Sequence, residues 1–235
     1  FGSENRIYKY DYKKRSFKSI NIKKQEDKGS DVTKYRVQKI IAFSEREALV
    51  ATRRDGVYVL DYQTMRLKRL FSGSNNILQG AYLSSNGYIY LSFWGQGLFC
   101  YEKTGKFIKR YTKENSDLTN NYVLDIVEKE GFLWLATDGG GINRLELSNE
   151  NFSNLYHIAG DKNSLPVNSV TILYKDENEG LWAGSVRGGV FNIKKSYIRT
   201  YKDCPLGYIN GLSEKSVTSL FEEPNGRLWI GTDGG

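Results

Sequence analysis

Six side chains with the chemistry to hold a polar ligand follow equivalent points in a set of repeated segments. They are Arg53, Arg54, Trp94, Gln96, Asp138 and Arg187. Arginine forms forked hydrogen bonds with carboxylate and sulfate groups, and an aromatic ring stacks on the face of a sugar. The combination predicts a binding site for an acidic ligand or a sugar. The alternative interpretation is that these residues are ordinary solvated turns.

Groups suited to catalysis are sparse. The only histidine, His157, has no nucleophile motif beside it, and we interpret it as a surface residue. The glycine run at 139–141 opens a strand rather than a helix, which excludes a dinucleotide or P-loop motif. Carboxylate pairs such as Glu222 and Glu223 belong to repeated turns. We therefore expect no enzyme activity, no cofactor and no metal site.

The elements that must position the candidate residues are repeated hairpins. Residues 132–145 contain an apolar run, a glycine turn and a second run of alternating character, which is typical of a β-hairpin. Copies begin at Leu181 and Leu228, and weaker copies begin at Ala51 and Ser92. Equivalent positions recur at spacings of 41 to 48 residues. Periods of this length, with several strands in each, predict the blades of a β-propeller.

The stretches before and after each hairpin also repeat, so each unit offers four short strands, and four antiparallel strands make one blade. We predict an all-β propeller with complete blades at about 35–71, 77–111, 122–156 and 169–201 and partial blades at 1–20 and 216–235. Both ends of the sequence fall inside a blade, so we expect a piece of a larger propeller. The alternative is a closed ring in which the two partial blades complete one another.

Antiparallel order divides the loops between the two ends of the strands. The glycine turns and the long connections between blades, such as 113–120 and 157–167, must share one end, which we call the loop face. The last glycine of the turn recurs as Gly56, Gly97, Gly141 and Gly189, as a positive φ or close packing would require. Recurring Trp134, Trp182 and Trp229 are predicted to be core residues rather than ligand platforms.

Composition narrows the possible partners. The 235 residues carry a net charge of +7, but most lysines and arginines are dispersed, and the densest cluster, at 13–15, is predicted to be a solvated edge. No run approaches the roughly 18 apolar residues of a membrane span. The aromatic residues recur at fixed blade positions instead of following a basic groove, which argues against nucleic-acid binding. Cys100 and Cys204 fall in different units, and we expect no disulfide between them.

The hairpins at 133–145, 181–190 and 228–235 resemble the two-component regulator propeller repeat, and the stretches at 168–172 and 152–156 fit it as well. The resemblance implies the periplasmic sensor region of a hybrid two-component histidine kinase. Such regions are similar to two seven-bladed propellers followed by an immunoglobulin-like domain, a membrane helix, a kinase core and a DNA-binding regulator. The family implies recognition of an oligosaccharide, control of glycan-utilisation genes and homodimerisation of the full-length sensor.

We therefore expect a non-enzymatic sensing fragment that binds an oligosaccharide on the loop face beside neighbouring blades or domains of the same parent chain. The positive charge favours an acidic glycan. One alternative is a propeller enzyme of the lyase type, which predicts a histidine and carboxylates converging on one loop face. Another is a protein-interaction propeller, which predicts exposed apolar patches.

Overall fold

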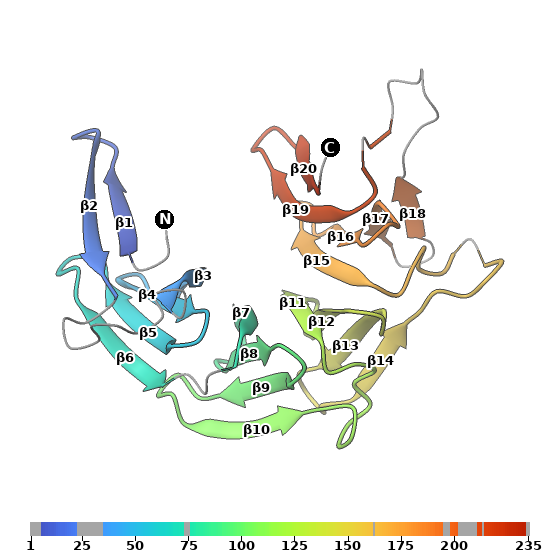
Figure 1. Ribbon diagram of the computed structural model, residues 1–235, viewed down its shortest axis with the longest axis horizontal. Helices are drawn as coiled ribbons and strands as arrows, with labels where there is room; N and C mark the ends of the chain where they lie inside the picture. The colour runs from blue at the N-terminus through green and yellow to red at the C-terminus, as the bar shows by residue number, and fades with distance from the viewer. Residues whose placement is uncertain are drawn as a thin grey trace. The chain divides into compact units, whose positions relative to one another are not determined.

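The computed structural model describes residues 6–22, 35–72, 76–161, 163–194, 198–201, 211–212 and 214–233. Within them every regular element is a β-strand, and no helix is long and apolar enough to cross a membrane. The chain divides into two compact units, one of residues 1–94 with 99–109 and the other of residues 95–98 with 110–235. Figure 1 labels the strands along the chain.

Unit 1 begins with a two-stranded antiparallel sheet and continues into a four-stranded one. The hairpin is β1 (Arg6–Asp11) with β2 (Ser16–Asn21), and the sheet is β3 (Val37–Ala42), β4 (Glu47–Thr52), β5 (Gly56–Asp61) and β6 (Leu67–Ser72). The next sheet has the order β10-β9-β8-β7 and comprises β7 (Leu78–Leu83), β8 (Ile89–Phe93), β9 (Gly97–Tyr101) and β10 (Phe107–Tyr111).

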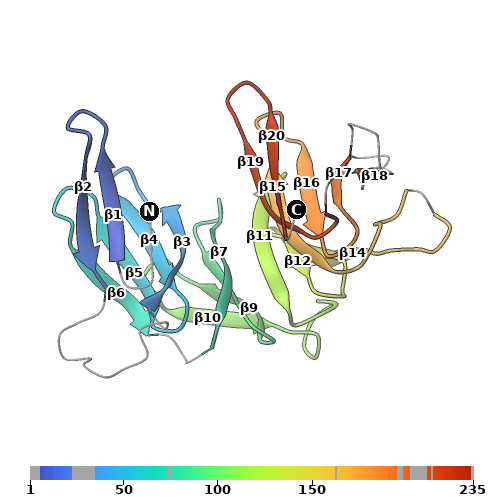
Figure 2. The same ribbon diagram turned by 45° about the horizontal axis from the view of Figure 1, so that its top comes forward.

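Unit 2 holds two further four-stranded sheets and a final hairpin. They are β11 (Val123–Lys129), β12 (Phe132–Thr137), β13 (Ile142–Glu146) and β14 (Phe152–Leu155); β15 (Val170–Lys175), β16 (Leu181–Ser185), β17 (Val190–Ile193) and β18 (Ile198–Tyr201); and β19 (Val217–Glu222) with β20 (Leu228–Thr232). Within this unit β15 contacts both β11 and β19, so successive sheets stack in chain order (Figures 1 and 2). The predicted all-β architecture of four-stranded antiparallel blades is confirmed.

Burial changes across each sheet in the same way. In β12 every residue from Leu133 to Thr137 is buried, because the second strand packs on both faces. The fourth strand is half exposed, as in β10, where Phe107 and Ile108 face solvent. Between the sheets of unit 2, Trp134, Ile142, Leu173 and Phe191 belong to one apolar cluster. Burial of such side chains is the main favourable contribution to folding.

The glycine turn joins one blade to the next through the main chain. The amides of Gly97, Gly141 and Gly189 donate to the carbonyls of Asn121, Asn168 and Lys215, which precede the following blade, at 2.8, 2.8 and 3.0 Å. The φ angles of these glycines are 73° to 76°. A Cβ on Gly141 would overlap the carbonyl oxygen of Leu155. Both reasons predicted for the recurring glycine, positive φ and close packing, are therefore confirmed.

A recurring hydroxyl fixes the same turn from within. Thr52, Thr137 and Ser185, each at the end of a second strand, donate from the side chain to the carbonyls of Gly56, Gly141 and Gly189 at 2.8 Å. All three are buried. Because a buried hydroxyl without a partner costs free energy, the turn conformation and the hydroxyl stabilise one another.

Two sequence expectations concern isolated residues. The basic cluster at 13–15 lies in the turn between β1 and β2 and is exposed, as predicted. Cys100 is buried. Cys204 lies outside the described residues, so the expectation that the two do not pair stays a prediction.

Candidate functional site

The positions chosen from the sequence are fixed in the main chain and variable in the side chain. Directly after the second strand, the amides of Arg53, Trp94 and Asp138 donate to the carbonyls of Arg36, Ile77 and Tyr122, at 2.8, 2.8 and 3.0 Å. Each bond closes a blade between its first two strands. The backbone thus presents a side chain at the loop face whatever its identity.

The six candidate side chains are divided equally between the two units. Arg53, Arg54 and Trp94 belong to unit 1, and Gln96, Asp138 and Arg187 belong to unit 2. In unit 1 Trp94 is 48% exposed. Arg53 is half-buried, and its Nε has no hydrogen-bond partner within the described residues.

In unit 2 the candidate side chains have separate surroundings. Gln96 is held by Arg110, whose Nη2 donates to the Gln96 Oε1 at 2.9 Å and whose Nε donates to the Gln96 carbonyl at 2.7 Å. Asp138 accepts a hydrogen bond from the hydroxyl of Ser169. Arg187 is exposed with a φ of 62°. In the described part of the chain no hydrogen bond or ion pair joins these three side chains.

A groove lies on the loop face of unit 2, beside the turn that carries Asp138. Its volume is about 610 Å³, and its walls include Lys113, Asp117, Gly140, Phe152, Asn154 and Tyr156. These residues come from the connection after β10, the glycine turn of the next blade, and β14 with its exit. The groove thus lies where the long connections were expected, and we call it the loop-face groove.

The floor of the groove is rigid. The Thr119 amide donates to the Oδ1 of buried Asn143 at 2.9 Å, and the Asn143 Nδ2 donates back to the Thr119 hydroxyl at 2.8 Å. That hydroxyl donates in turn to the Gly140 carbonyl at 2.7 Å. A network whose members are all paired holds its geometry, so the groove needs little reorganisation to receive a ligand.

The groove combines an exposed aromatic ring with one buried acceptor that has no partner among the described residues. Tyr156 is 44% exposed. The Nδ2 of Asn154 donates to the Asp117 carbonyl at 3.4 Å, while its buried Oδ1 has no partner among the described residues. In the connection nearby, side-chain hydrogen bonds lower the pKa of Glu114. The larger contribution comes from the Asn121 Nδ2 and the next from Thr112. Glu114 is therefore a carboxylate at neutral pH.

His157 has a structural role. Its Nδ1 lies 2.7 Å from the Leu165 carbonyl oxygen, and its amide donates to the Asn168 Oδ1 at 2.7 Å. These bonds hold the ends of the connection between β14 and β15 together. No group of histidine, cysteine and acidic side chains suited to a metal ion occurs in the described residues.

The model of the two component regulator propeller family matches residues 211–234. This segment is similar to a regulator propeller repeat. It contains the β19–β20 hairpin, one of the copies from which the resemblance was derived, and it confirms that resemblance. Comparison with curated proteins finds no match.

Three solved structures are similar to this chain in fold. The extracellular domain of BT3049 from B. thetaiotaomicron, described as a hybrid two component system, is 18% identical, with a TM-score of 0.67 over 99% of this chain and 36% of that chain. PorZ, a surface component of the type-IX secretion system of Porphyromonas gingivalis, is 14% identical, with a TM-score of 0.65 over 99% and 38%. A virginiamycin B lyase from Staphylococcus aureus is 14% identical, with a TM-score of 0.59 over 81% and 61%.

Identities this low show the propeller fold and nothing about activity, and the three structures differ in what they do. The chain spans little more than a third of the length of the BT3049 and PorZ structures. Any function of this chain must therefore be argued from its own site.

The recurring tryptophans of the repeat differ in environment. Trp134 is buried in the core of unit 2, as predicted. Trp229 is 59% exposed, so the prediction of a core residue is wrong there. The reason is that β20 has no third strand beside it among the described residues. The Trp229 Nε1 donates to the Glu223 Oε1 at 2.8 Å, which confirms that the Glu223 carboxylate has a structural role in the turn.

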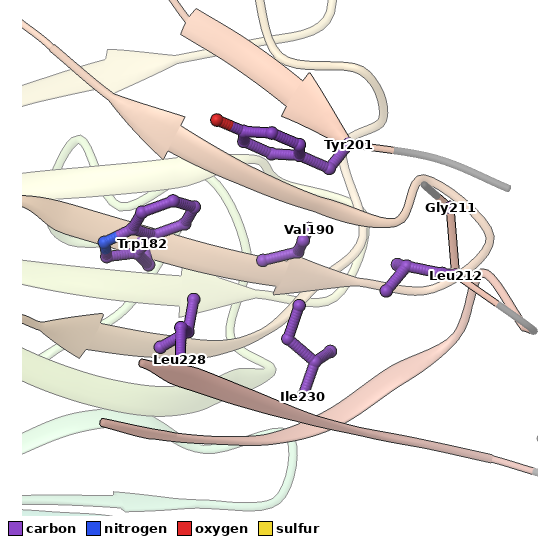
Figure 3. Close-up of a pocket in the computed structure, with 7 residues that line it drawn as sticks. All are labelled: Trp182, Val190, Tyr201, Gly211, Leu212, Leu228 and Ile230. Carbon is purple, nitrogen blue, oxygen red and sulfur yellow. The ribbon is translucent and has the colours of Figure 1, made fainter. Parts of the chain in front are cut away.

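Trp182 lines an apolar cavity of about 360 Å³. In Figure 3 Trp182 and Tyr201 lie on one side of it and Leu228 and Ile230 on the other, with Val190 between them. The cavity lies between the face of β16–β18 and the final hairpin. Its walls offer few polar groups, which makes it less suited to a polar ligand than the groove.

Sequence reasoning missed most of the groove. The turn at Asp138 was chosen, but Lys113, Asn154 and Tyr156 were not. The available signal was the length of the connections, which placed the correct segments on the correct face. It did not show which side chains converge.

Proposed function

We propose that this chain is part of a periplasmic sensor of a hybrid two-component system that recognises an oligosaccharide and regulates glycan-utilisation genes. The observation that carries the ligand proposal is the loop-face groove, with its aromatic wall, unpaired Asn154 Oδ1 and rigid floor. The regulator propeller repeat and the likeness to the BT3049 extracellular domain support a sensor as the setting. The parent would be a homodimeric sensor histidine kinase, with this part non-enzymatic.

The groove suits a sugar chain for three reasons. Its volume lies within the roughly 300–1,000 Å³ of small-ligand sites. Tyr156 and Phe152 offer ring faces for the C–H surface of a sugar, and Asn154 offers an acceptor for a hydroxyl. Lys113 adds a positive charge that suits an acidic glycan.

The candidates Arg53, Arg54 and Trp94 form a second proposed contact set, in unit 1, and Gln96, Asp138 and Arg187 remain proposed contacts in unit 2. We propose that Arg53 binds a carboxylate or sulfate group, because its Nε has no hydrogen-bond partner within the described residues and a guanidinium forms forked hydrogen bonds with such anions.

Calorimetric titration with neutral maltooligosaccharides and with acidic oligogalacturonides and chondroitin oligosaccharides tests the proposal. We expect saturable binding of at least one acidic oligosaccharide. Asn154→Ala and Tyr156→Ala should each weaken it by about tenfold, because each removes one direct contact. Arg53→Ala/Arg54→Ala reports on the contact set in unit 1.

The matched control is Tyr88→Ala. Tyr88 is 38% exposed, similar to Tyr156, but lies in a turn between first and second strands, away from the loop face. Its removal should leave the affinity unchanged. Binding that is lost only in the double arginine variant would move the site to unit 1. Absence of binding across the whole panel would contradict oligosaccharide recognition by this chain.

A second candidate function, protein interaction, is favoured by one observation. Phe221 and Trp229, which pair across the final hairpin, are 60% and 59% exposed. Exposed apolar groups of this kind mark contact surfaces. The lyase alternative has no comparable support, because the His157 ring is hydrogen-bonded to the Leu165 carbonyl within its own loop.

A further inference from the structure

The sheet β15–β18 lacks two side chains that fill the corresponding space in β11–β14. In the earlier sheet Trp134 pairs across the strands with Arg144. The guanidinium carbon of Arg144 lies 4.3 Å from the ring centroid of Phe132 and 4.7 Å from that of Trp134. The cation therefore covers both rings.

In the next sheet the same positions hold smaller residues. Trp182 pairs with Asn192, so Asn192 occupies the place of Arg144. The strand register likewise puts Gly180 in the place of Phe132. Neither the phenyl ring nor the guanidinium has a counterpart at these two positions. The result is a pocket of about 260 Å³.

The described residues that line this pocket belong to one sheet and its turns, so we call it the blade pocket. They are Asp176, Asn178, Gly180, Trp182, Asn192, Lys194 and Tyr201. It lies toward the β15–β16 turn, whereas the loop-face groove lies beside the turns at the other end of the strands. Its volume is below that of most drug-sized sites, which suits a ligand of a single ring.

The aromatic walls of the blade pocket are fixed in advance. The Trp182 Nε1 donates to the Asp176 Oδ2 at 2.8 Å, and the Asp176 Oδ1 accepts from the amides of Asn178 and Gly180. A Cβ at residue 180 would collide with this carboxylate, so glycine keeps the indole in place. The Tyr201 ring centroid lies 5.8 Å from that of Trp182.

Asn192 supplies an unused polar atom. Its side chain is only 5% exposed, and its buried Oδ1 has no hydrogen-bond partner among the described residues. Buried acceptors are normally paired, and an unpaired one is unfavourable. A ligand that donates a hydrogen bond to this oxygen would remove that cost.

We propose that the blade pocket binds one pyranose ring of a saccharide. The ring's C–H face would pack against Trp182 and Tyr201, and a hydroxyl would donate to the Asn192 Oδ1. Lys194 at the edge of the pocket disfavours a cationic ligand and suits the carboxylate of a uronic acid. The site is independent of the loop-face groove and of the ligand proposed there.

Fluorine NMR of protein labelled with 5-fluorotryptophan tests this proposal. The chain has four tryptophans, and Trp182→Phe identifies the resonance of Trp182. Titration with methyl glucopyranoside and with methyl galacturonide at millimolar concentration should shift that resonance saturably. The resonance of Trp134 should not move, because Arg144 already occupies the equivalent space.

Two substitutions at Asn192 separate binding from folding. Asn192→Arg recreates the arrangement of Arg144 over Trp134 and should weaken binding at least tenfold without opening a cavity. Asn192→Asp keeps the size and the acceptor and should retain binding. Lys194→Met should weaken the galacturonide and spare the glucopyranoside, which distinguishes acidic from neutral sugars.

Two further variants separate the blade pocket from the loop-face groove and from the neighbouring arginine. Asn154→Ala alters the loop-face groove and should leave the Trp182 shift intact, so the two sites succeed or fail separately. The register pairs Asn192 with Arg199, so the titration is repeated in Arg199→Ala. Any of three results would overturn the proposal. They are binding seen only in Arg199→Ala, a shift of the Trp182 resonance that survives Asn192→Arg, and no shift with either sugar.

Discussion

Tyr58 of unit 1 is held by two charged side chains, Asp55 and Arg69. It is 5% exposed, and its hydroxyl contacts the Asp55 carboxylate. Arg69 donates from Nη2 to the Tyr58 hydroxyl at 2.7 Å and to Asp55 at 2.6 Å. Burial, followed by the hydrogen bond to Asp55, raises the pKa of Tyr58 to about 12. The neutral phenol is therefore the stable form in the folded chain.

This pKa predicts how the stability of the fold depends on alkaline pH. Below pH 10 both the folded and the unfolded chain keep the proton, and the contribution of Tyr58 is fully present. As pH rises from 10 towards 12 the unfolded chain loses the proton first, so the free energy of unfolding falls, by at most about 1.4 kcal/mol for each pH unit. Urea unfolding at pH 9 to 11.5, compared between wild type and Tyr58→Phe, measures this.

The phenylalanine variant should lack that part of the pH dependence while sharing the rest. Parallel curves for the two proteins above pH 10 would mean that the phenol is not held neutral. Tyr88→Phe, at a half-exposed site, is the control that should leave the curve unchanged.

At the scale of the elements, the glycine turn between the second and third strands is the part that substitution should damage most. Gly141 has a φ of 73°, donates to Asn168 in the next blade, and leaves no room for a Cβ beside the Leu155 carbonyl. We expect Gly141→Ala to lower the free energy of unfolding by about 3 kcal/mol, from backbone strain and overlap together. Urea or thermal unfolding measures the change.

Gly131 provides the matched control. Its φ is 77°, but a Cβ there meets no atom within 4 Å. Gly131→Ala should therefore cost only the strain of positive φ, about 1 kcal/mol. Equal losses in the two variants would show that close packing at Gly141 contributes nothing.

The elements were more predictable from the sequence than the site. Strands follow from local alternation and from the repeats, and these signals survive in one chain without homologues. The groove depends on which side chains of separate connections converge, as Lys113 and Tyr156 do, and spacing carries no information about that. Trp229 was mispredicted because a repeat shows a residue's position in its own blade but not whether a neighbouring strand covers it.

The blade pocket illustrates a different limit. The substitution of Arg144 by Asn192 at equivalent positions is visible in the aligned repeats. The substitution indicates a pocket only because the Arg144 guanidinium covers Trp134 and Phe132, and that contact is visible only in the three-dimensional structure.

At the scale of the whole molecule, the net charge of +7 should affect ligand association. A positive field raises the local concentration of anionic ligands, and salt screens it over about 10 Å at 0.1 M. The affinity for an acidic oligosaccharide should fall on the order of tenfold between about 0.05 and 0.5 M salt. Calorimetry across this range measures the change.

Neutral maltooligosaccharides are the control and should bind with little dependence on salt. A similar fall for neutral and acidic sugars would indicate a general effect of salt on the protein and would contradict an electrostatic contribution to recognition.

The main-chain bonds from Gly141 to Asn168 and from Gly189 to Lys215 have a consequence for the history of such proteins. Because this bond uses backbone atoms and one glycine, any copy of the unit that keeps this glycine can form the same bond to the copy that follows it. In-frame duplication of a gene segment one unit long would lengthen the protein and preserve this main-chain bond. Each new copy would then be free to change the two residues after its second strand, so that diversity can accumulate at the face where ligands are met.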